Sequence, residues 1–192
     1  MFKRVGITGS PGTGKKTLAK GLSSITGYRV ININSLCISR GAISGRDKYG
    51  IIANIPKLKK IVAKQIRDDN FLLVGHLLPY ILSPKDTELA IVLRCNPYIL
   101  EERLKTRGYP EKKTLMNIGA ETLGTCYVDT VKKFGYKMIH VIDTSSKIHR
   151  ETIEEALLVM EGKNKYDGSD IDWLGLVREK GDLRRLFPDT YY

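Results

Sequence analysis

The sequence predicts an α/β fold, a doubly wound parallel sheet of five strands with helices on both faces. Three observations predict it. Apolar runs alternate along the chain with stretches whose apolar residues recur every three or four positions. The runs at 70–74 and 89–94 are almost wholly apolar, as in strands buried on both faces. A glycine-rich turn joins the first strand to a helix, which is typical of a ligand site at the carboxyl edge of such a sheet.

Each element has its own signal. The expected strands are, in order, 4–8, 28–33, 70–74, 89–94 and 137–142. The first expected helix covers 15–26, with Leu18, Leu22 and Ile25 on one face, and a short second helix capped by Asn34 or Ser35 runs through Arg40. A third helix runs from Asn54 through Ile66, and a fourth starts at Asn96 with Leu100 and Leu104 facing the sheet. We expect a long helix from Glu111 towards Gly135 and a last helix that ends at Gly162. Residues 41–47 are expected to form a flexible segment because glycines bound them.

The turn after the first strand carries the clearest chemical signal. Residues 9–15 read G-S-P-G-T-G-K, the G-x-x-x-x-G-K pattern of a phosphate-binding loop, or P-loop. Its glycines let backbone N–H groups converge on phosphate oxygens, the helix N-terminus adds positive potential, and Lys15 reaches the outer phosphates. The sequence therefore predicts a P-loop NTPase. Its phosphate-binding residues are Gly12, Thr13, Gly14, Lys15, Lys16 and Thr17.

The metal side of this loop departs from the pattern. The residue after the lysine is normally Ser or Thr, whose hydroxyl touches Mg²⁺, but here it is Lys16. Thr17 comes one residue late and is the candidate metal contact. The sequence leaves open whether the protein itself holds the ion.

Composition narrows the class further. With 192 residues the chain fits one domain, and none of its apolar runs approaches the roughly 20 residues that span a membrane. We find no readable signal peptide, and the three cysteines lack metal-ligand spacing, so we expect reduced thiols in a cytoplasmic protein. The net charge of +11 favours anionic partners such as nucleotides or RNA. The basic stretch beyond Gly162 fits either a disordered tail or one docked on the domain.

A GTPase is the first alternative. Residues 164–167 spell N-K-Y-D, which matches the guanine-reading N-K-x-D pattern. In GTPases that pattern closes a buried strand, whereas here it follows a helix in a polar stretch, and no D-x-x-G follows the strand ending at Val74. We interpret the match as chance.

Two further segments are typical of nucleoside monophosphate kinases: the short helix and glycine-bounded loop after the second strand, and the arginine-bearing helix after the fourth. The chain resembles the adenylate kinase isoenzyme six family, also called CINAP, over most of residues 3–174. The matching stretches are 8–15, 31–34, 75–77, 92–97, 102–109 and 111–113, with Asn117, Glu121, Asp172 and Trp173.

This resemblance implies a P-loop nucleoside monophosphate kinase domain over 1–162 and a basic C-terminal tail over 163–192. The acceptor-nucleotide segment would lie at about 32–54 and the lid at about 106–116. The family also implies an ATP:AMP phosphotransferase with ATPase activity, using ATP and Mg²⁺ with AMP as acceptor. It further implies a role in small ribosomal subunit maturation, through binding a small-subunit ribosomal protein. Together with the basic charge this makes rRNA a further candidate partner. The implied catalytic residues are Lys15, Arg107 and His76, and Arg107 would also bind ATP from the lid.

One departure from this family bears on the metal. Where the family has Asp or Glu two places before the histidine, this chain has Val74, so two metal-side groups are missing together. An active kinase and a catalytically weakened, nucleotide-gated ribosome-assembly protein both remain open. Arg103 is open as well, either near the nucleotide or ion-paired with Glu101 or Glu102 at the surface.

Overall fold

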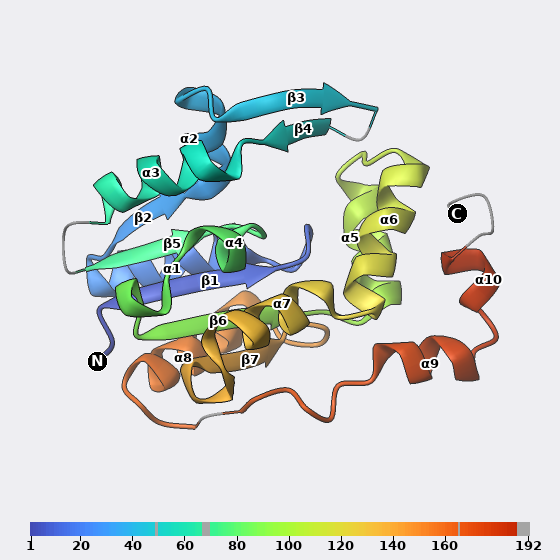
Figure 1. Ribbon diagram of the computed structural model, residues 1–192. Coiled ribbons are helices and arrows are strands. Elements are labelled where there is room, and N and C mark those ends of the chain that lie inside the picture. The colour runs from blue at the N-terminus through green and yellow to red at the C-terminus, as the bar shows by residue number, and fades with distance from the viewer. Residues whose placement is uncertain (49, 67–69, 165, 188–192) are drawn as a thin grey trace.

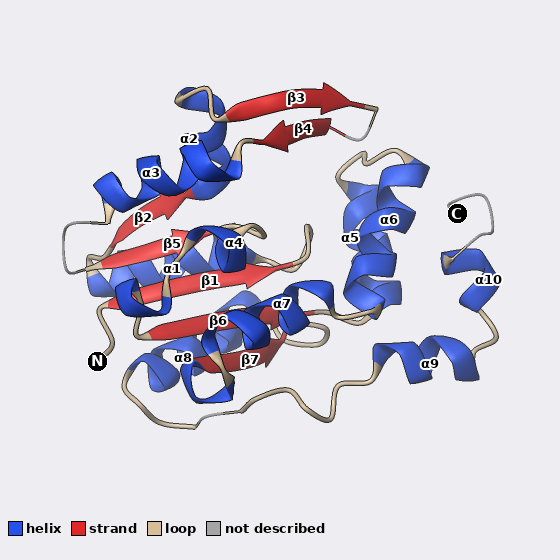
Figure 2. Cartoon of the chain, viewed as in Figure 1, coloured by secondary structure: helices blue, strands red, loops and turns tan. Residues whose placement is uncertain are grey.

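The computed structural model describes residues 1–48, 50–66, 70–164 and 166–187. It confirms the doubly wound α/β fold. Five parallel strands form one sheet in the order β2-β5-β1-β6-β7, and a separate two-stranded sheet pairs β3 with β4 (Figures 1 and 2). Because β1 is the middle strand, the loop that follows it lies at the centre of the carboxyl edge of the sheet.

The bounds of the elements agree closely with the expected ranges at the sheet. The strands are β1 Arg4–Gly9, β2 Arg29–Asn32, β3 Ile43–Asp47, β4 Gly50–Ala53, β5 Phe71–Val74, β6 Leu89–Arg94 and β7 Ile139–Asp143. The helices are α1 Lys15–Thr26, α2 Ile33–Ser39, α3 Ile55–Gln65, α4 Leu78–Ile81, α5 Pro97–Thr106, α6 Glu111–Thr122, α7 Thr125–Phe134, α8 His149–Met160, α9 Trp173–Glu179 and α10 Leu183–Leu186, with short 3₁₀ turns at Pro84–Asp86 and Tyr136–Met138.

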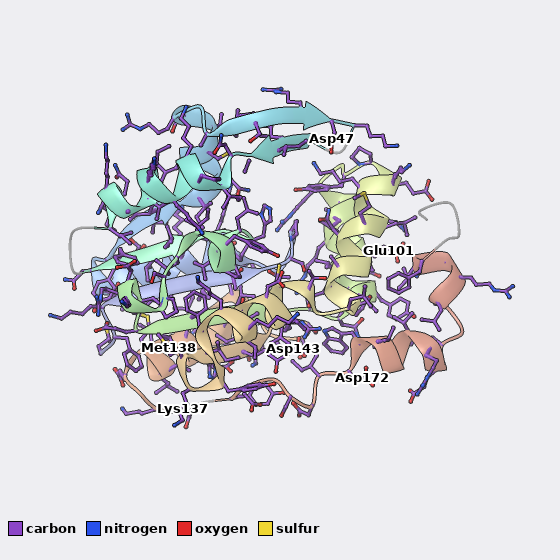
Figure 3. The ribbon with its side chains drawn as sticks, viewed as in Figure 1. Asp47, Glu101, Lys137, Met138, Asp143 and Asp172 are labelled. Carbon is purple, nitrogen blue, oxygen red and sulfur yellow. The ribbon has the colours of Figure 1, made fainter. Side chains whose placement is uncertain are left out.

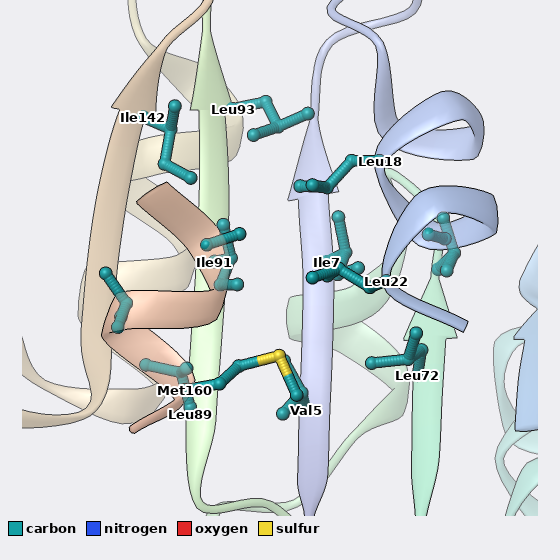
Figure 4. Close-up of a cluster of buried hydrophobic side chains, with 14 residues drawn as sticks. Val5, Ile7, Leu18, Leu22, Leu72, Leu89, Ile91, Leu93, Ile142 and Met160 are labelled. Carbon is teal, nitrogen blue, oxygen red and sulfur yellow. The ribbon is translucent and has the colours of Figure 1, made fainter. Parts of the chain in front are cut away.

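The core has two layers, one on each face of the sheet. On one face α1 and α8 cover strand side chains such as Ile7 and Ile91, and Met160 of α8 packs among them (Figure 4). Gly21 lets these two helices approach, since a β-carbon there would stand 2.2 Å from a carbon of Ile153. On the other face, residues of α3, α4 and α7 pack on the buried Phe71 and neighbouring strand residues. The sheet is thus held rigidly between two helical layers.

Most of the expected helix ends are confirmed. Gly27 ends α1 in a left-handed conformation, and the side chains of Asn54 and Asn96 cap α3 and α5. The α2 cap is different: Asn32 accepts a hydrogen bond from the Ser35 backbone at 3.0 Å, so α2 starts earlier than expected. Ile25 is 62% exposed rather than buried with Leu18 and Leu22.

Two other segments differ from expectation. The segment at 41–47, expected to be a flexible connection, contains the strand β3, which pairs antiparallel with β4 in a hairpin. The single long helix expected from Glu111 is two helices, because Gly124 takes a left-handed φ of 64° between α6 and α7. A β-carbon at Gly124 would stand 3.3 Å from the Arg94 guanidinium, so this break also makes room for a buried charge.

The stretch beyond Gly162 is docked on the domain as far as it is described. Helices α9 and α10 lie beside α5 and α6, and α8 is therefore not the last helix (Figure 1). Val177 and Leu186 are buried with Leu100, Leu104 and Ile118 in a third cluster. Leu100 and Leu104 thus face this cluster, not the sheet as expected.

Two sequence signals have a plain structural place. In the N-K-Y-D segment, Lys165 lies outside the described residues. The Tyr166 carbonyl accepts a hydrogen bond from the backbone N–H of Val141 in β7.

The three cysteines are free thiols: Cys37 and Cys95 are buried, and Cys126 is half-buried. None of the helices described is both long and apolar enough to cross a membrane.

Candidate active site

The phosphate-binding loop joins β1 to α1 through three glycines in unusual conformations. Gly9, Gly12 and Gly14 have φ of 136°, 96° and 97°, a region that L side chains rarely adopt. A β-carbon at Gly9 would lie 2.4 Å from the Leu93 carbonyl oxygen, and one at Gly12 would lie 2.6 Å from a methyl of Leu100. The loop therefore needs glycine at these positions for conformation and for close packing.

Lys15 lies inside the curve of this loop. Its ammonium group donates hydrogen bonds to the carbonyl oxygens of Gly9 at 2.7 Å and Ser10 at 2.8 Å. Burial lowers the pKa of Lys15 to about 8, although the nearby Cys126 and Glu121 act in the opposite direction. Lys15 is thus held at the loop as a poorly solvated cation, and binding of an anion next to it would stabilise this charged form.

A buried polar network supports the loop from beneath. Glu121 of α6 accepts hydrogen bonds from the Ser10 hydroxyl at 2.6 Å, the Arg94 Nε at 2.7 Å and the Cys95 backbone at 3.0 Å. The Arg94 and Glu121 side chains are 3% and 1% exposed, so their ion pair is shielded from solvent. This network joins the loop, the end of β6 and α6 into one unit.

Our sequence analysis did not assign Glu121 a role. A signal exists in the pattern, because Thr114, Ile118 and Glu121 share the buried face of α6. A carboxylate on such a face needs a buried donor. The donors come from residues 111 and 27 positions away in the chain, so the sequence alone does not identify them.

A cleft of about 850 Å³ opens above the loop. It brings together Gly12, Gly14, Lys15, Lys16, Thr17, His76 and Arg107 from the expected site. It is also lined by Asn34, Cys37 and Ile38 of α2, by residues of the β3–β4 hairpin, by Tyr109 of the turn after α5, and by Lys113 and Asn117 of α6. Figure 3 shows Asp47 at the end of the hairpin, across from the top of α6. The expected acceptor and lid segments thus form opposite walls of one cleft.

His76 follows β5 and lines this cleft with Lys15. Burial, reinforced by the charge of Lys15, lowers the pKa of His76 to about 4. The imidazole is therefore neutral near neutral pH in this structure, with one ring N–H that can donate a hydrogen bond into the cleft.

A second, smaller pocket of about 30 Å³ lies on the other side of the loop. Thr13, Gly14 and Thr17 line it together with Arg103 and Thr144. Arg103 donates to the Thr144 hydroxyl at 3.2 Å and to its carbonyl oxygen at 2.7 Å. Glu101 pairs instead with Lys105 and Arg185. Of the two alternatives for Arg103, a place near the nucleotide or a surface ion pair with Glu101 or Glu102, its position beside the loop favours the first.

The residues present do not fit a magnesium ion held by the protein. The strands flanking β1 end at Val74, buried in the core, and at Arg94, paired with Glu121. No cluster of three or more His, Cys, Asp or Glu side chains occurs within the described ranges. Lys16 begins α1 beside Lys15 on the wall of the cleft.

Comparison with known proteins agrees with this geometry. Residues 5–124 match the family model described as "AAA domain". A protein of Thermococcus onnurineus named "Putative adenylate kinase" is 32% identical over 169 residues, covering 88% of this chain and 90% of its own. A protein of Pyrococcus abyssi with the same name is 33% identical over 170 residues, with coverage of 88% and 90%.

Solved structures share the fold at low identity. A gluconokinase from Sinorhizobium meliloti superposes with a TM-score of 0.58 at 17% identity, covering 83% of this chain and 92% of its own. A shikimate kinase from Bacteroides thetaiotaomicron gives a TM-score of 0.59 at 14% identity, covering 84% and 99%. These likenesses confirm the P-loop α/β fold.

Proposed function

This chain belongs to the AAA-domain family and to the family of the archaeal relatives named "Putative adenylate kinase", and from this we propose that it is an ATP:AMP phosphotransferase. The observation that carries the proposal is the cleft that Lys15, His76 and Arg107 line together with the phosphate-binding loop. Residues of α2 and of the β3–β4 hairpin also line it, which supports a second nucleotide facing the first.

The donor nucleotide fits the loop. Its β- and γ-phosphates would meet the backbone N–H groups of residues 12–17 and the ammonium of Lys15. The small pocket beside Thr13, Arg103 and Thr144 lies on the far side of the loop from the cleft and would receive the nucleoside end. The planar guanidinium of Arg103 is suited to stacking on a base.

The acceptor fits the other wall. Apolar side chains of Ile51 and Ile52 on β4 and Ile38 on α2 line the cleft there, with Asn34 as a polar partner. Such a mixture suits a nucleobase with a few hydrogen-bonding edges. The proposed acceptor segment at about 32–54 corresponds to α2 and the hairpin, and the proposed lid at about 106–116 to the turn between α5 and α6.

The transfer itself needs little from the protein. A non-bridging oxygen of the acceptor phosphate, already ionised near neutral pH, forms a bond to the γ-phosphorus while the bond to the bridging oxygen of ADP breaks. No proton has to move. The protein's contribution is to align the two nucleotides and to stabilise the transferring charge with Lys15 and Arg107. Neutral His76 would hold a phosphate oxygen by a hydrogen bond.

Two finer assignments belong to the same proposal. We place the chain in the isoenzyme six (CINAP) branch, cytoplasmic, with a part in small ribosomal subunit maturation through a ribosomal protein or rRNA. The net charge of +11 supports an anionic macromolecular partner. The poor fit to Mg²⁺ favours a second candidate function, a weakly catalytic protein whose bound nucleotide gates such an assembly step.

The experiment is product analysis with purified protein, ATP and Mg²⁺, with and without AMP. The kinase predicts ADP that forms only with AMP and disappears in Lys15→Ala. Tight ATP binding without AMP-dependent ADP would reject the kinase and leave the assembly protein, for which co-sedimentation with small ribosomal subunits is the direct test. No nucleotide binding at all would reject both.

A further inference from the structure

Lys16 occupies the place where a P-loop ordinarily presents the hydroxyl that touches Mg²⁺. It is the second residue of α1, is exposed, and lines the cleft with Lys15, Arg107 and Lys113. A long cation at this position would compete with Mg²⁺ for the phosphate oxygens of a nucleotide bound in the cleft.

The neighbouring hydroxyl does not restore the ordinary arrangement. Thr17 is one position further along α1, and one residue of helix is a rotation of about 100°. Besides the cleft, its side chain lines the small pocket with Arg103 and Thr144. The turn of the helix therefore directs Thr17 partly away from the place that Lys16 takes.

The carboxylate partner is replaced as well. P-loop NTPases hold Mg²⁺ with the loop Ser or Thr and an Asp at the end of a neighbouring strand. Here β5 ends at Val74, which is 1% exposed and packed in the core, and β6 ends at Arg94. Glu121 lies beneath the loop, but its carboxylate already accepts from Ser10, Arg94 and Cys95.

We infer that this chain binds the triphosphate tail of its nucleotide as the metal-free anion, with the Lys16 ammonium in the place of the magnesium ion. The inference rests on the proposed nucleotide binding and specifies which form of the ligand is bound. Lys15 and Lys16 together supply two positive charges at the outer phosphates. A magnesium ion added there would meet Lys16 at close range, and like charges repel.

The test measures binding, not turnover. The dissociation constant of the β,γ-imido analogue of ATP is determined by calorimetry, once with EDTA and once with excess MgCl₂ at equal ionic strength. The wild type should bind about 10-fold more tightly with EDTA. Lys16→Thr, which restores the hydroxyl of the ordinary motif, should reverse the preference and bind more tightly with Mg²⁺.

Matched variants distinguish the effect of removing the Lys16 charge from the effect of adding a hydroxyl at this position. Lys16→Gln removes the charge without adding a hydroxyl, so it should weaken binding with EDTA and lose the wild-type preference. Lys20→Thr removes an exposed charge one turn further along the same helix and should keep the wild-type preference. A Lys20→Thr protein that lost it would show that general charge, and not Lys16, decides.

Two further outcomes separate a failure of the inference from a failure of the proposed function. If the wild type bound the analogue only with Mg²⁺, the inference would be overturned while the proposed nucleotide binding stood. If it bound under neither condition, the proposed function would fail and the inference with it.

Discussion

The two walls of the cleft are built in different ways. The α6 wall consists of the turn after α5 and of α6, from which Tyr109, Lys113 and Asn117 line the cleft. It is held in two places: Glu121 of α6 accepts a hydrogen bond from Ser10 of the loop, and Arg185 of α10 pairs at 3.0 Å with Glu101 of α5, the helix that packs on α6. The hairpin wall, β3 and β4, forms its own small sheet and leaves Ile51 and Ile52 39% and 47% exposed. The α6 wall carries a buried ion pair, whereas the hairpin packs on the core through Ile43 and Ala53 near its base and is exposed towards its far end.

This difference predicts how the cleft closes. An element with few buried contacts opens and moves at low cost, whereas a buried ion pair and a docked tail resist displacement. We therefore expect the hairpin wall to move towards the α6 wall, which stays in register with the loop. Gly50 already lies near the α6 wall, since a β-carbon there would stand 3.9 Å from the Lys113 ammonium.

The largest effect should come from breaking the tie beneath the loop. Glu121→Ala leaves the buried Arg94 unpaired, and such a loss costs about 3–5 kcal/mol of unfolding free energy. Urea denaturation measures it, with Glu102→Ala, an exposed glutamate of α5, as the control expected to stay within about 0.5 kcal/mol. The double variant Arg94→Leu, Glu121→Leu should lose less unfolding free energy than the sum of the losses in the two single leucine variants. A loss equal to that sum would show that Arg94 and Glu121 are not energetically coupled.

Undocking the tail should have the next largest effect. Leu186 is 2% exposed in the cluster with Leu100 and Ile118, so Leu186→Ala should cost about 2 kcal/mol. Hydrogen exchange should then become faster in α9 and α10 and in the facing residues of α6, while β1 is unaffected. Unchanged hydrogen exchange in α6 would show that α9 and α10 do not restrain the α6 wall.

The pH dependence of stability tests the site between the walls. The folded-state pKa of His76, about 4, lies below its ordinary 6.5, so the unfolded chain binds more protons between these values and stability rises with pH across this window. For a partly exposed group we expect about 1–2 kcal/mol. His76→Asn should flatten the rise, and His149→Asn, which removes an exposed histidine of α8, should keep it.

The smallest effect on stability should come from the hairpin. Ile52→Ser changes an exposed side chain and should alter the unfolding free energy by less than about 0.5 kcal/mol. Because Ile52 lines the cleft, AMP affinity should nonetheless fall about 5-fold, measured by calorimetry. The exposed Ile25 of α1, changed to Ser, is the control that should leave both quantities unchanged. A loss of stability without a loss of AMP affinity would make the hairpin a structural element only.

The parts of the molecule that follow from local sequence were predicted. The loop, the strands of the large sheet and the caps at Gly27, Asn54 and Asn96 depend on residues close in the chain. The hairpin was missed because I-S-G-R-D at 43–47 lacks the β-branched alternation of a strand and depends on pairing with β4. The network at Glu121 was missed because it joins segments far apart in the sequence.

The most direct test of the central claim is whether two nucleotides face one another across this cleft. The probe is a dinucleotide with two adenosines joined by five phosphates, which spans a donor and an acceptor site at once. Our account predicts that it binds at least 100-fold more tightly than ATP, as linked ligands do, and slows hydrogen exchange both in residues 9–17 and in the hairpin at 43–53. Binding no tighter than ATP, with protection confined to the loop, would contradict an acceptor site and with it the phosphotransferase.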